Sequence, residues 1–432
     1  MPCFLSPTAG YILNVGHGAA PGPIDKAGRE LLRALSTRVL EIAALPCQAE
    51  KRSLWYCHSK LEPVRPLLLV FPEDSWEEIL PADRLTLADP FWRQWEWYLR
   101  HLIYRHESIP DDSVIEPDLW VPTVLGGTGW GMAARYQSSG MPKGSYVWYA
   151  PIEEERDLDR LARPTVSYDA AATRAQMDAL GEVLGDLMPI RRACPLFHAN
   201  IIGEATWLRG LQQVLVDMYD RPAWLHRLMG LISESLVQRV EHLEREGVLT
   251  LNNRGHYNDS GGVGWSDELP SDTFDGDHVR LQDLWGFGVA QEMDGVGPAQ
   301  HEEFVLQYQL PLLERCGLNA YGCCEPYTTK FDMLRKVPRL RRVSVSPWCD
   351  REVAAARLRD ECIFSWKPNP AMLVGRFSSD AIRADIERTL DIAHGCVLEI
   401  VLKDTFTLEH EPQRIEAWAQ TARAAIDARC GG

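Results

Sequence analysis

Two thiols, a phenol and a carboxylate lie close together in one short stretch, Tyr321-Gly322-Cys323-Cys324-Glu325-Pro326. Thiolates and carboxylates are ligands that Zn²⁺ takes, and a metal-bound thiol is deprotonated at neutral pH. On an extended segment, alternate side chains point the same way, so Cys323 and Glu325 are predicted to face one side and Cys324 the other. The stretch therefore predicts a metal site or, alternatively, a buried cysteine pair behind a carboxylate that binds an organic substrate.

Other reactive side chains follow the apolar stretches of the second half of the chain. Glu292 and Cys349 are candidates for further metal ligands, because each follows a neighbouring predicted strand. His256 precedes a polar, glycine-rich loop and is either a site residue or a loop brace. The candidate site residues are Arg254, His256, Asp259, Gln291, Glu292, Tyr321, Cys323, Cys324, Glu325, Trp348, Cys349, Lys367, Asn369, Lys403 and Asp404.

Two lysines, Lys367 and Lys403, stand at predicted strand ends. A lysine in such a place forms a Schiff base if its pKa is depressed, or it holds a substrate carboxylate. Arg254 has the same anion-holding interpretation. If one barrel brings these strand ends together, all of these side chains face one cavity.

The elements that must position these residues alternate between strand and helix. A helix is predicted to begin at Asp220-Arg221-Pro222, with a capping carboxylate and a proline in its first turn, and to end at Gly247. The remaining strands are predicted at 66–72, 248–251, 318–321, 342–346, 362–366 and 397–402. The remaining helices are predicted at 31–43, 89–106, 299–316, 328–337, 351–359, 379–394 and 412–428.

Repeated strand–helix units indicate parallel strands joined by crossover helices. No Gly-x-Gly-x-x-Gly follows an early strand, and polar residues collect at the carboxyl ends of the late strands, so a closed barrel is favoured over an open doubly wound sheet. The predicted fold is α/β, a (β/α)₈ TIM-type barrel with an N-terminal helical extension and long loops. Residues 1–60 are predicted as a leader and helical extension, and residues 61–432 as one barrel.

The net charge of −16 argues against a nucleic-acid partner, which needs basic surface. The sequence has no basic run suited to an anionic membrane, no apolar run of about 20 residues, and no signal peptide at its start, so a cytoplasmic protein is expected. Eleven scattered cysteines do not form a disulfide framework. Most of the fifteen tryptophans are expected to pack the core and loops.

At these residues the chain resembles the uroporphyrinogen decarboxylase superfamily, over about residues 205–430. The stretch Asp217–Met229 is similar to the central helix region of that family. Tyr321–Glu325 falls where its methyltransferase branch has a zinc motif, His-x-Cys-Gly, and Leu402–Thr405 falls where that branch has a distal zinc cysteine. The resemblance implies a (β/α)₈ barrel, and it carries one zinc ligand over to this chain, Cys323.

The resemblance is incomplete at the metal. Tyr321 replaces the motif histidine, and Lys403, Asp404 or Thr405 stands in place of the distal cysteine. If zinc is bound, its other ligands must come from Glu292, Glu325, Cys349 or Asp404. The arginine-rich signature of the decarboxylase branch is reduced to Arg65-Pro66, which leaves little to hold a substrate with eight carboxylates.

The resemblance therefore implies a methyltransferase that moves a methyl group between a small methylated substrate and a corrinoid protein, with Zn²⁺ and a methylcorrinoid carried by that partner. The alternatives are a uroporphyrinogen-type decarboxylase and a non-catalytic barrel that binds a corrinoid partner; a homodimer stays open. The expected roles are catalytic for Tyr321, Glu292, Lys367 and Asp404, substrate-binding for His256, Arg254, Trp348, Asn369 and Lys403, and metal-binding for Cys323, Glu325 and Cys349.

Overall fold

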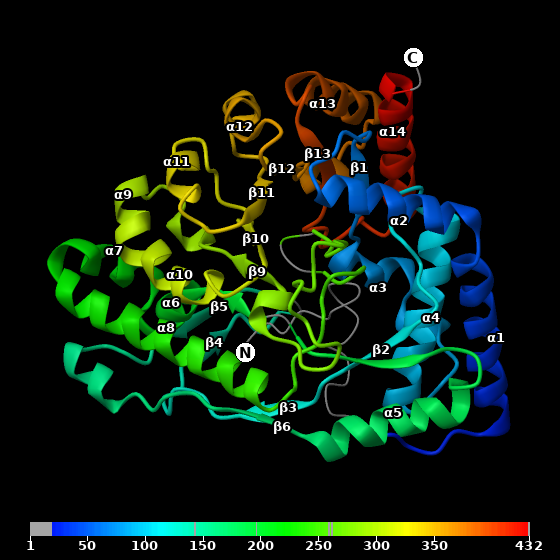
Figure 1. Cartoon of the computed structure of the whole chain (residues 1–432), viewed down its shortest axis with the longest axis horizontal. Helices are drawn as coiled ribbons and strands as arrows, with labels where there is room; N and C mark the ends of the chain where they lie inside the picture. Colours follow the sequence, from blue (N-terminus) through cyan, green and yellow to red (C-terminus); the bar gives the residue numbers. More distant parts are fainter. Residues whose placement is uncertain (1–19, 142–143, 196, 258–259, 261, 431–432) are drawn as a thin grey trace.

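The computed structural model describes residues 20–141, 144–195, 197–257, 260 and 262–430. A parallel sheet of seven strands forms its centre, in the order β1-β13-β12-β11-β10-β9-β8 (Figure 1). This confirms the mixed α/β class and the parallel strands. The seven strands are β1 Leu67–Val70, β8 His198–Ala199, β9 Trp285–Gly288, β10 Leu318–Tyr321, β11 Leu340–Val345, β12 Ile363–Trp366 and β13 Val397–Leu402.

Three two-stranded sheets accompany the central sheet. They pair β2 Leu119–Pro122 with β7 Ile190–Ala193 in parallel, β3 Leu125–Gly127 with β6 Val166–Tyr168, and β4 Arg135–Ser138 with β5 Tyr146–Tyr149. The chain passes from β7 to β8 within a few residues, so the order β1, β2, β7–β8, β9 to β13 is consistent with a TIM-like fold. Among the described residues no ladder joins β1 to β2, so closure of the barrel stays a prediction.

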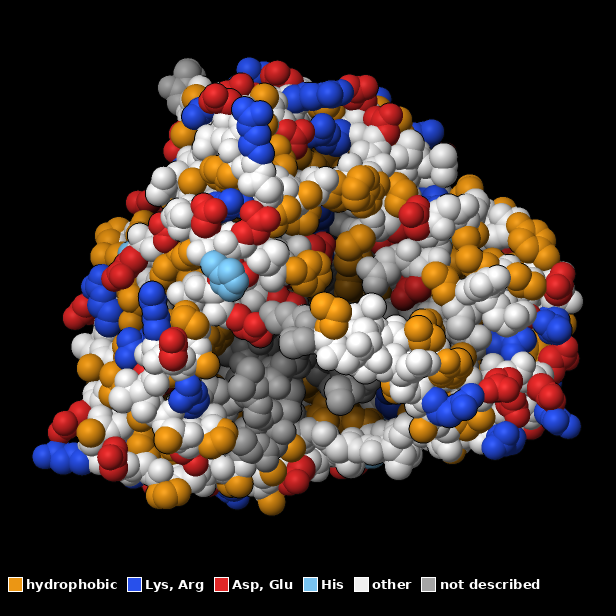
Figure 2. Space-filling model, turned by 180° about the vertical axis from the view of Figure 1, so that it is seen from behind, with side chains coloured by type: hydrophobic (Ala, Val, Ile, Leu, Met, Phe, Trp, Pro, Cys, Tyr) orange, Lys and Arg blue, Asp and Glu red, His pale blue; other side chains and the backbone are white. Residues whose placement is uncertain are grey.

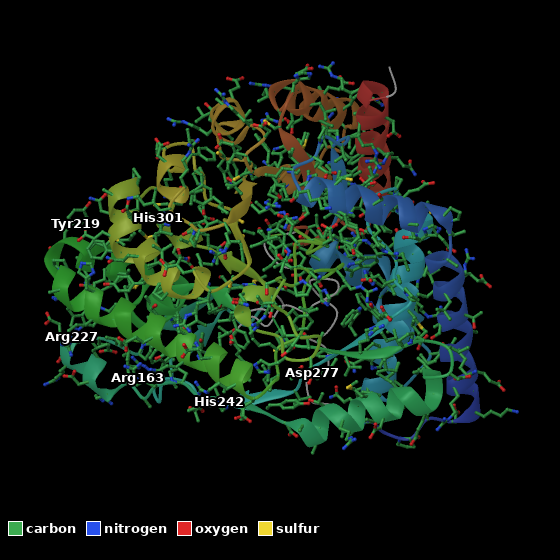
Figure 3. All side chains as sticks on the ribbon, in the orientation of Figure 1. Arg163, Tyr219, Arg227, His242, Asp277 and His301 are labelled. Carbon is green, nitrogen blue, oxygen red and sulfur yellow. The ribbon has the colours of Figure 1, made fainter. Side chains whose placement is uncertain are left out.

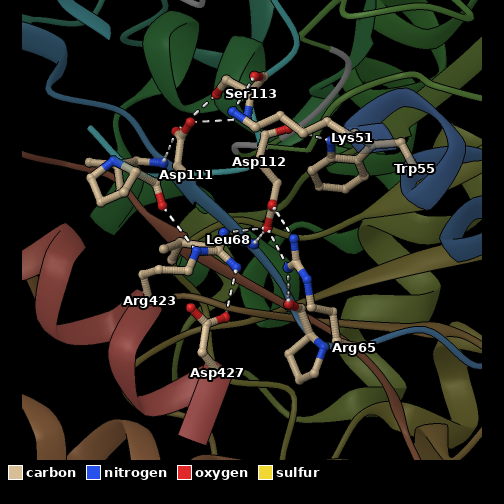
Figure 4. Close-up of polar contacts among 12 residues, drawn as sticks. Lys51, Trp55, Arg65, Leu68, Asp111, Asp112, Ser113, Arg423 and Asp427 are labelled. Carbon is tan, nitrogen blue, oxygen red and sulfur yellow. Dashed lines mark hydrogen bonds and ion pairs between the residues drawn. The ribbon is translucent and has the colours of Figure 1, made fainter. Parts of the chain in front are cut away.

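Side chains satisfy the edge of β1 where that ladder would be. The backbone N–H of Leu68 donates to the Asp112 carboxylate over 2.7 Å, and the N–H of Asp112 donates to the Leu68 carbonyl over 2.8 Å (Figure 4). The N–H of Val70 donates to Asp111 over 3.1 Å. Asp111 and Asp112 thus take the place of a neighbouring strand, because buried backbone groups need partners.

Helices cover the outer side of the sheet, with α13 and α14 beside β13 and β1 (Figure 1). A π-helical turn, Glu302–Leu306, joins α9 to α10. The helices are α1 Lys26–Ala43, α2 Pro46–Ser59, α3 Trp76–Ile79, α4 Pro90–Ser108, α5 Ala170–Leu184, α6 Ile201–Arg209, α7 Leu211–Asp220, α8 Pro222–Arg245, α9 Pro298–His301, α10 Gln307–Leu313, α11 Phe331–Leu334, α12 Arg351–Leu358, α13 Ser379–Ile392 and α14 Gln413–Cys430. Short 3₁₀ turns lie at Glu73–Ser75, Ala82–Arg84, Glu155–Arg160, Leu281–Asp283, Gln291–Met293 and Pro370–Leu373.

The two faces of the sheet pack against different partners. Leu68 and Ile400 belong to the large core between strands and helices. Their neighbours Leu69 and Val401 point to the other face, because side chains alternate along a strand, and they pack there with Trp265. Trp265 comes from the loop between α8 and β9, so that loop fills part of the inner face.

Two local predictions are wrong. Residues 248–251 form no strand; instead the Asn252 side chain accepts from the Trp285 N–H over 2.9 Å and donates to the Trp285 carbonyl over 3.1 Å. Asp220 does not cap α8, because it ends α7, and Arg221 stands at the N-cap without a side-chain bond. No helix in the described ranges is long and apolar enough to cross a membrane.

Candidate functional site

The Cys323 thiol lies just beyond the carboxyl end of β10 and faces three polar groups. Its Sγ accepts a hydrogen bond from Ser260 Oγ over 3.2 Å and lies 4.0 Å from Lys403 Nζ. It also lies 3.5 Å from the Sγ of Cys324. Ser260, β10 and β13 thus bring to one point residues that are far apart in the sequence, as expected for the carboxyl ends of parallel strands.

A glycine turn places Cys323 there. Gly322 has φ +101°, and a Cβ at this position would lie 2.5 Å from the Tyr327 ring, so only glycine fits. The chain turns instead of continuing as a strand, and the predicted alternation of Cys323 and Glu325 therefore does not apply. The Glu325 carboxylate braces the turn by accepting from the backbone N–H groups of Cys323 and Ala290, each over 3.0 Å, and from the Tyr327 hydroxyl.

Asp404 completes the other side of the cluster. Its carboxylate pairs with Lys403 Nζ over 2.6 Å and accepts from the Cys324 thiol over 3.5 Å. Asp404 has φ +59°, a left-handed conformation that is uncommon outside glycine. The chain turns at Asp404, directly after β13, and this turn lets neighbouring residues both reach the thiol pair.

The two thiols share one proton, and their surroundings decide which sulfur keeps it. Cys324 faces the Asp404 carboxylate, whereas Cys323 faces an ammonium and a hydroxyl donor. The hydrogen bond from Cys324, with Lys403 and Ser260, outweighs burial and lowers the pKa of Cys323 to about 7. The pKa of Cys324 is raised by the same shared proton and by burial. Cys323 is therefore the thiolate of the pair.

Glu73 is a site residue that the sequence reasoning missed. It follows β1, is buried, and has φ +50°. Burial raises its pKa to about 7, although the charge of Lys403 opposes this; Asp404 and Cys323 raise it further. The signal was present, since Glu73 directly follows the predicted strand 66–72 and residues at such strand ends face the site.

The described residues do not fit a zinc ion. In the described part of the chain, no group of three or more His, Cys, Asp or Glu side chains is arranged to hold a metal. The Lys403 ammonium instead lies beside both Cys323 and Asp404, so it supplies the positive charge that a metal would bring. Burial by itself would lower the pKa of Lys403, but the neighbouring thiols and carboxylates raise it, and the residue stays charged.

Tyr321 lies on the opposite face of β10 from this cluster. Its hydroxyl donates to Gln309 Oε1 over 2.5 Å and lies 3.1 Å from the Nε2 of His301, which Figure 3 labels on α9. It belongs to the core between strands and helices, and burial raises the pKa of its phenol well above the usual value. The structure therefore gives Tyr321 no access to the cluster, because alternate strand residues face opposite ways.

The other two candidate metal ligands also lie apart from the thiol pair. Cys349 is buried in the outer core, where its Sγ accepts from Thr328 Oγ1 over 3.7 Å. Glu292 stands in the turn after β9, and burial, together with the charge of Glu325, raises its pKa. Its Oε2 is buried without a hydrogen-bond partner among the described residues. No contact of either residue with Cys323 is present among the described residues.

The remaining candidates at late strand ends have structural surroundings. Trp348 is 68% exposed beyond β11. Asn369 caps the turn Pro370–Leu373 by accepting from the Ala371 N–H over 3.0 Å. Lys367 donates to Ser365, which in turn donates to Glu399 inside the sheet, and Gln291 is exposed. None of them is brought to Cys323.

The two candidates that precede β9 are held near β2. Arg254 pairs with Glu116 over 2.6 Å and with Asp118 over 2.9 Å. His256 is buried 4.6 Å from the Trp120 ring, and burial, with the charge of Arg254, lowers its pKa to about 3, so it is neutral. Asp259 lies outside the described residues.

The surface shows where the molecule is open. The face turned away in Figure 1 is hollowed near its centre, with acidic and hydrophobic side chains around the hollow (Figure 2). A separate cavity of about 930 Å³ is lined by Gln282 and Gly317, which precede β9 and β10. This cavity lies at the amino ends of the strands and holds none of the candidate residues, so we place the site at Cys323, where the reactive groups converge.

No model of a known protein family matches the chain, and no curated protein matches it either. Among solved structures, the chain is similar to a methyltransferase from Methanosarcina mazei, with a TM-score of 0.49 and 11% identical residues. The match covers 88% of this chain and 99% of that one. A similarity this distant does not distinguish one function from another, and we base the function on the site.

Proposed function

We propose that this chain is a methyltransferase in which the Cys323 thiolate accepts the methyl group. One observation carries the proposal: Cys323 Sγ faces the Lys403 ammonium over 4.0 Å and the Ser260 hydroxyl over 3.2 Å, which holds it as a thiolate near neutral pH. The methyl donor is a small methoxy or methylamine-type compound, and the second partner is a corrinoid protein. A closed (β/α)₈ barrel is part of the same proposal.

The cluster supplies each group that the first transfer needs. A bond forms between Cys323 Sγ and the methyl carbon while the bond from that carbon to the donor heteroatom breaks. The heteroatom takes the proton of Glu73, whose carboxyl is still substantially protonated at neutral pH. Lys403 stabilises the thiolate before the transfer, and Asp404 holds Lys403 in place over 2.6 Å.

A corrinoid on the partner protein supplies a cobalt centre that exchanges methyl groups with sulfur. When the methyl group leaves Cys323, the thiolate returns to the same two partners, Lys403 and Ser260. The chain therefore stabilises the same charged sulfur before the first transfer and after the second, which suits it to carry the group in both directions. The described residues do not fit zinc, so the proposal includes no metal-assisted step on this chain.

The test follows the methyl group on the protein. The full chain is incubated with isotope-labelled methoxy and methylamine donors without a corrinoid acceptor, and Cys323 is examined by peptide mass spectrometry. We expect one labelled methyl group on Cys323, none in Cys323→Ser, and normal labelling in Cys349→Ser, whose thiol is buried apart from the site. Methyl transfer to an added corrinoid protein at an unchanged rate in Cys323→Ser would contradict the proposal.

The same preparations separate the two alternatives. Release of CO₂ from a porphyrinogen would indicate the decarboxylase. That reading has little support, since Arg65 of the remaining Arg-Pro pair is bound to Asp112 over 2.7 and 3.0 Å (Figure 4). Binding of a methylcorrinoid protein with no transfer from any donor would indicate the non-catalytic barrel.

A further inference from the structure

We propose that Cys323 and Cys324 are an oxidative modification site, which a hydroperoxide closes into a disulfide between adjacent residues. The two Sγ atoms lie 3.5 Å apart, and both thiols are free. They are half-buried, so a small peroxide can reach them. In the part of the chain that the structure describes, no other two thiols are hydrogen-bonded to each other.

The surroundings give the two sulfurs different tasks. Cys323 faces the Lys403 ammonium and the Ser260 hydroxyl, which favour a thiolate that attacks the peroxide. Cys324 faces the Asp404 carboxylate over 3.5 Å and keeps its proton. The other described thiols lack this arrangement: those of Cys316 and Cys362, for example, are bonded to backbone carbonyls at 3.6 and 3.3 Å.

The chemistry is balanced in two steps. The Cys323 thiolate attacks one peroxide oxygen, the O–O bond breaks, and the leaving alkoxide or hydroxide takes a proton from Lys403, which leaves a sulfenic acid on Cys323. Cys324 then attacks the Cys323 sulfur and forms the S–S bond; the thiol proton and the sulfenic hydroxyl leave as water. The peroxide is reduced to an alcohol or water, and the two thiols are oxidised to one disulfide.

The disulfide is expected to be easily reduced. Adjacent residues bring their Cα atoms closer than most disulfides do, and a strained disulfide is more readily reduced. Closing it removes the sulfur that accepts the methyl group, and this consequence rests on the proposed function. The cross-link itself does not depend on that function.

The experiment treats the full chain with hydrogen peroxide and maps the cysteines by fragmentation mass spectrometry. Fragmentation is needed because Cys316 shares the tryptic peptide 316–330 with the pair. We expect this peptide to lose two hydrogen atoms, located at Cys323 and Cys324, and to regain them with dithiothreitol. In Cys324→Ser, Cys323 should gain oxygen atoms instead, whereas the control Cys316→Ser should close as the unchanged chain does.

Two results would overturn the proposal. One is a wild-type peptide that keeps both hydrogen atoms after other thiols have been oxidised, which needs no variant to interpret. The other is oxygen added to Cys323 as fast in the wild type as in Cys324→Ser. Cross-linking in a protein that transfers no methyl group would leave this proposal standing and remove the proposed function, so the two fail separately.

Discussion

Asp112 and Cys323 are both anionic groups held by cations at strands of the central sheet, but their surroundings differ. The Asp112 carboxylate accepts from Arg65 at both oxygens, from the Leu68 N–H, and from Arg423 over 2.8 Å (Figure 4). Burial alone would raise its pKa, but the two arginines hold that pKa below the ordinary value. Asp112 therefore stays charged, and its partners satisfy both oxygens.

The Cys323 cluster has the opposite character. Two thiols and two carboxylates, those of Glu73 and Asp404, surround one ammonium, so the anionic groups outnumber the cation. One thiol keeps its proton, and Glu73 keeps its own up to a pKa of about 7. A buried charge with a full set of partners stabilises the fold, whereas a cluster with too few cations keeps protons that chemistry can use. The predictions below test this difference.

Removing Asp112 should have the largest effect on stability. In Asp112→Ala, Arg65, Arg423 and the Leu68 N–H all lose a partner, and we expect the free energy of unfolding to fall by about 3 kcal/mol. Since the folded pKa lies below the unfolded one, the contribution of Asp112 is present above about pH 4 and is lost as the pH falls through the folded pKa. Urea unfolding at pH 7 and at pH 3 measures both.

The matched control is another bidentate pair, which lies at the surface. Arg33 binds Asp186 over 2.6 and 2.7 Å, and both side chains are exposed. Asp186→Ala should change stability far less than Asp112→Ala, because solvent screens an exposed pair. Equal losses in the two variants would show that burial does not distinguish the Asp112 network.

Glu73→Gln should stabilise the protein at high pH. Between the ordinary value of 4.5 and about 7, the unfolded chain releases this proton while the folded protein retains it, so stability falls as the pH rises. Glutamine has no proton to release, and we expect the variant to gain roughly 2 kcal/mol relative to the wild type between pH 4 and pH 8. Unfolding by urea across this pH range measures the gain.

Asp74→Asn is the control for this pH dependence. Asp74 is the next residue in the same turn and is half-buried. Its variant should keep the pH dependence of the wild type. A Glu73→Gln protein with that same dependence would show that Glu73 does not retain its proton in the folded state.

The strands and helices of the second half could be predicted from the sequence, because they are regular and apolar. The strands at 318–321 and 397–402 appear with those bounds. The stretch 248–251 is equally apolar but forms no strand, since a side chain, that of Asn252, bonds to the Trp285 backbone where a strand would. Such a substitution depends on tertiary contacts that periodicity does not contain.

The site could be predicted only in part, for a related reason. The strand-end rule brought Cys323, Lys403 and Asp404 together correctly, because it depends only on the parallel order of strands. It failed for Tyr321, which is still inside β10 and faces the helices. It also missed the turn at Gly322, where a positive φ redirects the chain and makes Glu325 a brace.

Lys403→Met should have the smallest effect of the three, and it concerns reactivity. The Lys403 ammonium favours the Cys323 thiolate, so its loss should raise the pKa of that thiol from about 7 by at least about one pH unit. The rate of iodoacetamide labelling at Cys323, followed against pH, measures this pKa. One pH unit corresponds to about 1.4 kcal/mol of interaction between the two charges.

Lys330→Met provides a buried lysine for comparison. Its Nζ donates to the Met293 carbonyl over 2.8 Å, and it lies beside Glu325 and not beside Cys323. We expect its labelling midpoint to stay near the wild-type value. If Lys403→Met also kept that midpoint, the ammonium would not set the thiolate. The Cys323 cluster would then resemble the Asp112 network, with charges that stabilise the fold and no proton available for transfer.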